Sequence, residues 1–230
     1  MGRWIFHFDF MATQPFPGTI TSLVAQAKKR RGMGTRVNVF IDEKFSFAVS
    51  ILVIEKFRLA RGMAVDAAFL TELLRYDGDT KAYAKAIFFL GYRARSEAEV
   101  RERLKRDEWP DEVIERVLQK LREQGFLNDE NFSNLWVENR SHSRPRGGRM
   151  LQQELRQKGV DKETIAAALP GAEEESENAL AALKTKLRLW EKFDEKTARE
   201  KGIGFLMRRG FNYGVAKTAW DQSHEEDEES

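Results

Sequence analysis

The chain has 230 residues, 41% of them hydrophobic and 33% charged, as expected for a folded protein with a core. It contains no cysteine and only three scattered histidines, which excludes disulfides, thiol chemistry and the common zinc sites. No segment has the length and apolarity of a membrane span, and the N-terminal residues do not resemble a signal peptide. We therefore expect a cytoplasmic protein with no cofactor, no metal and no membrane contact.

Charge is segregated along the chain. The net charge of +2 includes five acidic residues at positions 225–229, so residues 1–224 carry +7, and Lys28–Arg31 form a basic block. Such segregation is common in proteins that meet polyanions, although solvated tails account for most charge runs. We expect residues 1–19 to form a flexible extension and residues 221–230 an acidic tail.

Residues 20–80 are predicted to form a small module of a β-hairpin followed by helices. Apolar residues alternate over 36–41 and again at Phe45, Phe47 and Val49, with a polar break at residues 42–44. The break lacks glycine, so the turn type is open. Asp66 is a plausible N-cap of the next helix, which Asp77-Gly78-Asp79 is expected to end.

The rest of the chain is predicted to consist of helices that repeat. Leu104, Leu155 and Leu206 are each 51 residues apart. Bulky apolar residues follow each leucine at fixed spacings, and these are predicted core positions: Trp109, Val160 and Phe211, then Leu118, Leu169 and Trp220. Gly159 and Gly210 stand where a helix C-cap would use a positive φ, and Glu108 has that place in the first unit.

Each unit also has a leading helix, which gives three three-helix repeats at residues 81–133, 134–170 and 176–220. In the third unit Leu180, Leu183, Leu187 and Trp190 step along one helical face. Ser96 and Glu99 form a capping box, and the cluster at residues 128–130 is expected to cap a helix. The predicted fold is mainly α: three tandem three-helix repeats in an elongated, curved body, preceded by the small hairpin module.

Six segments, in this order, resemble the signatures of the RecX family. They are residues 36–50 (RVNVFIDEKFSFAVS), 92–104 (YRARSEAEVRERL), 125–132 (GFLNDENF), 136–140 (WVENR), 154–169 (ELRQKGVDKETIAAAL) and 208–217 (RRGFNYGVAK). The resemblance covers roughly residues 20–220. The chain departs from the family pattern at two places. It has Asp42-Glu43-Lys44 where family members often have Asp-Gly-Glu, and Asn128-Asp129 where they often have Asp-Asp.

The resemblance implies a non-enzymatic regulator, expected to be a monomer, that binds the RecA–DNA filament. It implies inhibition of the RecA ATPase, of strand exchange and of coprotease activity, in recombination and the SOS response. DNA would be contacted without sequence preference, through the filament.

Contacts with such a filament should use cations near the turns between helices. The candidates are Arg93, Arg95, Arg140, Arg144, Arg146, Arg149, Arg208 and Arg209. A structural role is favoured for Arg93, Arg95, Arg208 and Arg209, which can cover apolar surface or complement a helix dipole. A binding role is favoured for the loop from Arg144 to Arg149, because nothing in a fold requires its arginines. Glu154 and Glu163 are interpreted as ordinary residues of amphipathic helices.

Two other classes of function are compatible with parts of the sequence to different degrees. A helical-repeat DNA-binding protein of the helix–turn–helix type, acting without RecA, fits the paired helices and the basic charge. No helix is rich in the residues that contact base edges, however. An enzyme is disfavoured, because the chain has no phosphate-binding loop, no nucleophile elbow and no metal cluster.

Overall fold

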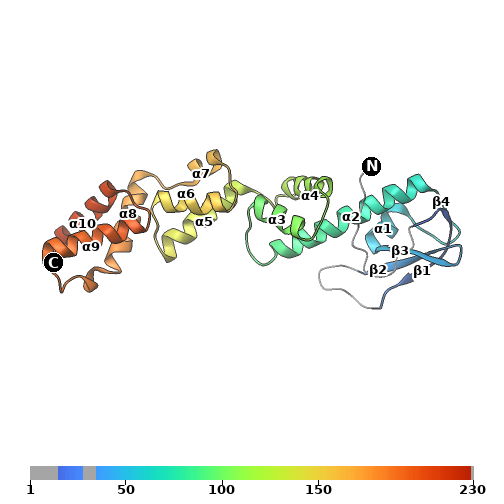
Figure 1. Cartoon of the computed structure of the whole chain (residues 1–230), viewed down its shortest axis with the longest axis horizontal. Helices are drawn as coiled ribbons and strands as arrows, with labels where there is room; N and C mark the ends of the chain where they lie inside the picture. The colour runs from blue at the N-terminus through green and yellow to red at the C-terminus, as the bar shows by residue number, and fades with distance from the viewer. Residues whose placement is uncertain (1–14, 28–34, 229–230) are drawn as a thin grey trace. The chain divides into compact units, whose positions relative to one another are not determined.

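The computed structural model describes residues 15–27 and 35–228 (Figure 1). Side chains are described as far as His224. The described residues form two compact units, one within residues 1–93 and 101–124 and the other within residues 94–100 and 125–230. Most of the predicted extension at 1–19 and the basic block Lys28–Arg31 lie outside the described residues.

The N-terminal module combines a small sheet with the first two helices. The strands are β1 (Gly18–Ala25), β2 (Arg36–Ile41), β3 (Lys44–Ser50) and β4 (Ala64–Val65). The first three-helix repeat follows without a break, because its leading helix is the second half of α2. The helices of the first half are α1 (Ile51–Phe57), α2 (Ala67–Leu90), α3 (Glu97–Arg106) and α4 (Asp111–Glu123).

The second and third repeats are helical throughout. Their elements are α5 (Asp129–Ser143), α6 (Gly148–Gln157), α7 (Lys162–Ala168), α8 (Ala172–Lys184), the 3-10 helix η1 (Leu187–Leu189), α9 (Glu195–Arg208) and α10 (Tyr213–Glu228). The mainly α class, the three tandem three-helix repeats and the small β module are thus confirmed.

The predicted hairpin is present as β2 and β3, within an antiparallel sheet of order β3-β2-β1-β4. Strand β1 was not predicted, although its Ile20 is fully buried. The expected alternation in β3 is wrong at one place, since Phe45 is 41% exposed and Ser46 is buried. A register shift between Val39 and Phe40 explains this, because a bulge moves the side chains that follow to the other face.

The hairpin turn is a two-residue loop in which both residues are left-handed. Asp42 has φ 46° and Glu43 has φ 65°, as in a type I′ turn. The Asp42 carboxylate accepts a hydrogen bond from the Thr19 backbone N–H at 3.1 Å, which ties the turn to β1. Glu43 therefore stands where a type I′ turn strongly prefers glycine.

We expect Glu43→Gly to raise the free energy of unfolding by about 1 kcal/mol, because glycine adopts the left-handed conformation without steric cost. The measurement is urea denaturation followed by circular dichroism. Asp42→Gly is the matched control. It also places glycine at a left-handed position, but it removes the carboxylate that accepts the hydrogen bond from the Thr19 N–H. We therefore expect a smaller gain in the free energy of unfolding, or a loss. Equal gains in both variants would contradict this account.

Helix α2 runs through Asp77-Gly78-Asp79, so the prediction that these residues end it is wrong. Asp77 is buried, accepts a hydrogen bond from the Ser50 N–H at 3.0 Å and pairs with Lys81 at 2.5 Å. Asp79 accepts two hydrogen bonds from the Arg116 guanidinium of α4. Both carboxylates are held by tertiary contacts, which outweigh their weak local preference for turns.

Gly78→Ala is expected to stabilise the protein by about 1 kcal/mol, because alanine is the better residue inside a helix. A methyl group added at Gly78 would meet no atom within 4 Å. Gly62→Ala is a matched control in the same unit, since its methyl is equally unobstructed but its φ is +86°. Thermal melts should therefore shift up for Gly78→Ala and down for Gly62→Ala, and an upward shift of both would contradict the backbone argument.

The three predicted repeats share one helix–turn geometry. Leu104, Leu155 and Leu206 are fully buried, as expected. In every repeat the leucine carbonyl accepts a hydrogen bond at 3.2 Å from the backbone N–H five residues later, in Trp109, Val160 and Phe211 respectively. The residue before each donor is left-handed: Glu108 (φ 60°), Gly159 (φ 76°) and Gly210 (φ 92°). This is a Schellman motif, so the C-cap prediction is confirmed, including its non-glycine member.

Several helix limits differ from those expected. Residue 80 lies inside α2, and α5 begins at Asp129 rather than after the predicted boundary at 133. Leu187 and Trp190 do not continue α8, which ends at Lys184, although both pack on the third repeat's core. The expected acidic tail from residue 221 is helical to Glu228, as part of α10.

Candidate functional site

The second and third repeats meet backbone to backbone within the second unit. The Gly147 N–H donates a hydrogen bond to the Arg209 carbonyl at 3.0 Å. A Cβ at Gly147 would overlap the backbone of Gly210 and Phe211, and one at Gly210 would lie 2.5 Å from the Met150 Cβ. Only glycine allows this approach. The contact brings the end of α9 beside the loop between α5 and α6.

Four arginines gather at this junction, which we call the junction cluster: Arg140, Arg144, Arg146 and Arg209. Arg140 and Arg146 both pair with the Glu154 carboxylate of α6, the former at 3.0 Å between Nε and Oε2. Arg209 donates a hydrogen bond to the Pro145 carbonyl at 3.2 Å. Arg144 is exposed, and among the described residues its side chain has no hydrogen bond or ion pair.

Two members of the junction cluster are held by aromatic rings. The Arg140 guanidinium carbon lies 4.6 Å from the centroid of the Trp136 ring, and that of Arg209 lies 4.7 Å from the centroid of Phe205. A stacked guanidinium keeps its N–H edge available for an anion. The rings therefore restrict the arginines without neutralising them.

The cluster carries more positive charge than its surroundings neutralise. Burial lowers the pKa of Arg146, and the charges of Arg140, Arg209 and Arg144 lower it further. Burial and the charge of Arg144 lower the pKa of Arg209. Glu154 is the one carboxylate paired with the cluster in the described part of the chain. Four guanidiniums thus share one counter-charge, which favours an external anion.

The other predicted contact residues are not part of the cluster. Arg149 is exposed in the first turn of α6, where the helix dipole disfavours a cation. Arg208 is exposed in the last turn of α9, where the dipole favours one. Arg93 is exposed, and Arg95 lies 3.9 Å from the Glu99 carboxylate.

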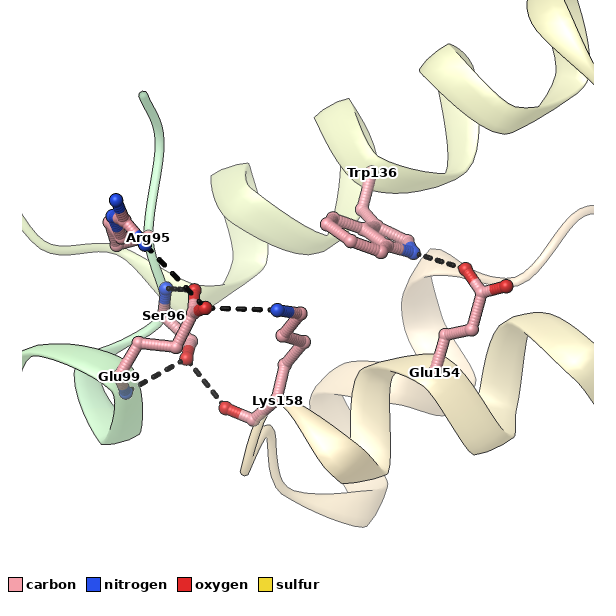
Figure 2. Close-up of polar contacts among 6 residues, drawn as sticks. All are labelled: Arg95, Ser96, Glu99, Trp136, Glu154 and Lys158. Carbon is pink, nitrogen blue, oxygen red and sulfur yellow. Dashed lines mark hydrogen bonds and ion pairs between the residues drawn. The ribbon is translucent and has the colours of Figure 1, made fainter. Parts of the chain in front are cut away.

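A second polar network joins the start of α3 to the second repeat (Figure 2). The Ser96 hydroxyl donates to the Lys158 carbonyl at 2.5 Å and accepts from the Glu99 N–H, which confirms the predicted capping box. The Lys158 ammonium pairs with Glu99 at 2.9 Å and lies 5.3 Å from the Trp136 ring centroid. Trp136 in turn donates its indole N–H to Glu154 at 2.8 Å.

Trp136 and Glu154 therefore connect this network to the junction cluster. The sequence interpretation of Glu154 as an ordinary helical residue is wrong, because its side chain is 11% exposed and receives the indole and two arginines. Its partners lie on other elements, so helical periodicity gave no sign of them. A glutamate on the apolar side of α6, next to the buried Leu155, was the one available signal.

Asp129 links the same region to α3. Its carboxylate accepts a hydrogen bond from the Glu97 N–H at 2.8 Å. Burial raises the pKa of Asp129, and the nearby carboxylates of Glu97, Asp161 and Glu99 add to that rise, while the hydrogen bond opposes it. The predicted capping cluster at residues 128–130 is confirmed through Asn128, whose side chain accepts from the Asn131 N–H at 2.8 Å.

We expect Asp129→Asn to flatten the dependence of stability on pH. Since the folded carboxyl has a raised pKa, the folded state holds the proton more tightly than the unfolded state. This contribution to stability is complete in acid and is lost as the pH rises through the raised pKa. Asparagine keeps the acceptor for the Glu97 N–H but does not titrate. Urea midpoints from about pH 4 to pH 7 test this, and an unchanged slope would contradict it.

Across residues 15–27 and 35–228, no three histidine, aspartate or glutamate side chains are grouped so as to hold a metal ion. Within the same residues no helix combines the length and apolarity needed to cross a membrane.

Fold and surface together define a tandem three-helix-repeat protein with a cationic junction, a class that presents binding surfaces. Four family models match the chain in order. They are the regulatory protein RecX N-terminal domain (residues 18–66) and the first, second and third three-helix domains of RecX (residues 82–121, 128–169 and 173–220).

Individual relatives agree with these models. The chain is 34% identical to the regulatory protein RecX of Bacillus velezensis, over 92% of this chain and 80% of the relative. It is 32% identical to that of Bacillus subtilis, over 91% and 79%. A crystal structure of a regulatory protein RecX matches with a TM-score of 0.70 and 29% identity, covering 88% of this chain and 98% of that one. The chain belongs to the RecX family.

Proposed function

We propose that this protein binds the RecA–DNA filament and inhibits the RecA ATPase, and with it strand exchange and coprotease activity. The supporting observation is the ordered match of all four RecX domains between residues 18 and 220. The relatives carry the name regulatory protein, which is consistent with a role without catalysis. We further propose that it acts in the cytoplasm as a monomer, in recombination and the SOS response.

The eight predicted arginines are proposed as the contact residues, with different weights. Arg144 and Arg149 have the strongest case, because the fold gives them no partner among the described residues. The other members of the junction cluster also have structural contacts, Arg140 and Arg146 with Glu154 and Arg209 with Pro145, and Arg95 has one with Glu99. Replacing any of these four would therefore disturb the fold as well as any interface.

The test is a titration of this protein into RecA with single-stranded DNA and ATP, followed as the rate of ATP hydrolysis. We expect inhibition at substoichiometric to near-stoichiometric amounts of the protein. No change in rate over that range would overturn the proposal. A gel shift without RecA separates the alternative: tight, sequence-selective binding would favour a helix–turn–helix DNA-binding protein, whereas weak, salt-sensitive binding would not.

A further inference from the structure

We infer that the junction cluster is a built site for the phosphate backbone of nucleic acid, formed where the second and third repeats meet. The inference deepens the proposed function, on which its biological setting rests, but the contact itself requires no recombinase. It assigns the DNA contact to three side chains from the α5–α6 region (Arg140, Arg144 and Arg146) and one from the end of α9 (Arg209).

The junction cluster is assembled by tertiary structure and opposed by its own charges. Arg146 and Arg209 both have a lowered pKa, from burial first and from neighbouring arginines second. Like charges brought together in this way weaken the folded state unless something offsets them. Glu154 supplies one negative charge to Arg140 and Arg146, which leaves the cluster with an excess of three positive charges.

The geometry of the junction cluster also favours the binding of an oxyanion. Stacking on Trp136 and Phe205 fixes the planes of Arg140 and Arg209, so less conformational freedom is lost when an oxyanion binds. Arg144 is exposed at the end of α5, and its side chain has no hydrogen bond or ion pair among the described residues. The set thus combines prearranged guanidiniums with one arginine that can follow the ligand.

The charge of the junction cluster also indicates which kind of anion it binds. Successive phosphates of a nucleic acid need several cations along a line, whereas a lone carboxylate needs one fork-shaped partner. At the N-terminus of α6, the Gly148 N–H already donates to Glu175 at 2.9 Å, so this donor is not available to the anion. The guanidiniums carry the positive charge of the site. Their excess charge favours a polyanion over an acidic peptide, whose charge is less dense.

The experiment measures the anisotropy of a fluorescent oligothymidylate with the full-length protein at low salt, without RecA. We expect the double variant Arg144→Gln/Arg146→Gln to weaken binding about tenfold or more. The slope of log affinity against log salt should fall by about 1.4, since each phosphate contact on single-stranded DNA contributes about 0.7. The same measurement with a labelled DNA duplex of equal length compares double-stranded with single-stranded phosphate backbones.

The matched control is Arg156→Gln/Arg188→Gln, which removes the same charge from two exposed arginines of the same unit. Arg156 lies in the last turn of α6 and Arg188 lies in η1, and among the described residues neither has a hydrogen bond or ion pair with the cluster. Equal losses of DNA affinity in the two double variants would overturn the inference, because the overall positive charge of the unit would then explain the binding. So would an unchanged salt slope, or protein that binds polyglutamate but not the oligonucleotide, which would indicate an acidic protein partner instead.

Folding is controlled separately. The single variant Arg144→Gln removes a side chain with no partner among the described residues, so it should leave the thermal melt unchanged and still weaken binding severalfold. The ATPase titration separates the two proposals. Inhibition of RecA combined with no specific loss of DNA binding would overturn this inference alone, whereas specific DNA binding without inhibition would overturn the proposed function alone.

Discussion

Gly147→Ala is expected to destabilise the second unit by about 3 kcal/mol, because its methyl group would overlap the backbone of the third repeat. Backbone cannot rotate aside as a side chain can, so the repeats must separate. Separation also breaks the Gly147–Arg209 hydrogen bond. Urea denaturation monitored by tryptophan fluorescence measures the loss, since Trp136, Trp190 and Trp220 all lie in this unit.

The neighbouring Gly148→Ala variant is a matched control. A methyl group there would lie 3.5 Å from the Glu175 carboxylate, which is ordinary van der Waals contact. Gly148 is also the first residue of helix α6, where alanine is the better residue. We expect an effect within about 0.5 kcal/mol of zero. Equal destabilisation by the two substitutions would show that the backbone contact at Gly147 is not what holds the repeats together.

Asp77→Ala is expected to cost about 3 kcal/mol in the N-terminal unit. The substitution removes the acceptor of the Ser50 N–H at the start of α1 and the carboxylate paired with Lys81. Burial already lowers the pKa of Lys81, against the opposing effect of Asp77. Without that carboxylate, the charged ammonium becomes still more costly to keep in the fold.

Asp77→Asn separates the two contributions, because its amide oxygen can still accept from Ser50 while the charge is gone. We expect it to lose less stability than Asp77→Ala, as measured by urea denaturation followed by circular dichroism. Equal losses would assign the effect to the ion pair alone. A loss below about 0.5 kcal/mol in both variants would contradict the assignment of Asp77 as a buried structural carboxylate.

Local patterns predicted the elements whose causes are local. The hairpin followed from alternation in β2 and β3, and the capping box at Ser96 followed from spacing. The equal intervals between Leu104, Leu155 and Leu206 predicted three equivalent turns, because a Schellman motif depends on a few consecutive residues. Even Glu108 was placed correctly in the left-handed conformation from its position in the repeat.

Predictions were wrong where distant residues decide the outcome. Asp77-Gly78-Asp79 has the composition of a helix end, yet Ser50 and Arg116 hold its carboxylates inside a continuous helix. The bulge at Ser46 reversed the exposure of Phe45, and β1 was missed because its partner lies beyond an intervening segment. Propensity is worth fractions of a kcal/mol per residue, so a single buried hydrogen bond can override it.

The candidate site divides in the same way. The sequence by itself determined the family, the repeat, and an arginine-rich loop that no helix required. The tertiary structure alone decided that Arg209 joins that loop and that Glu154 serves two of its arginines. The physical reason is that Gly147 and Gly210, which have no Cβ, let the backbones of two repeats touch. A pattern in the sequence does not show which distant segment will pack against such a glycine.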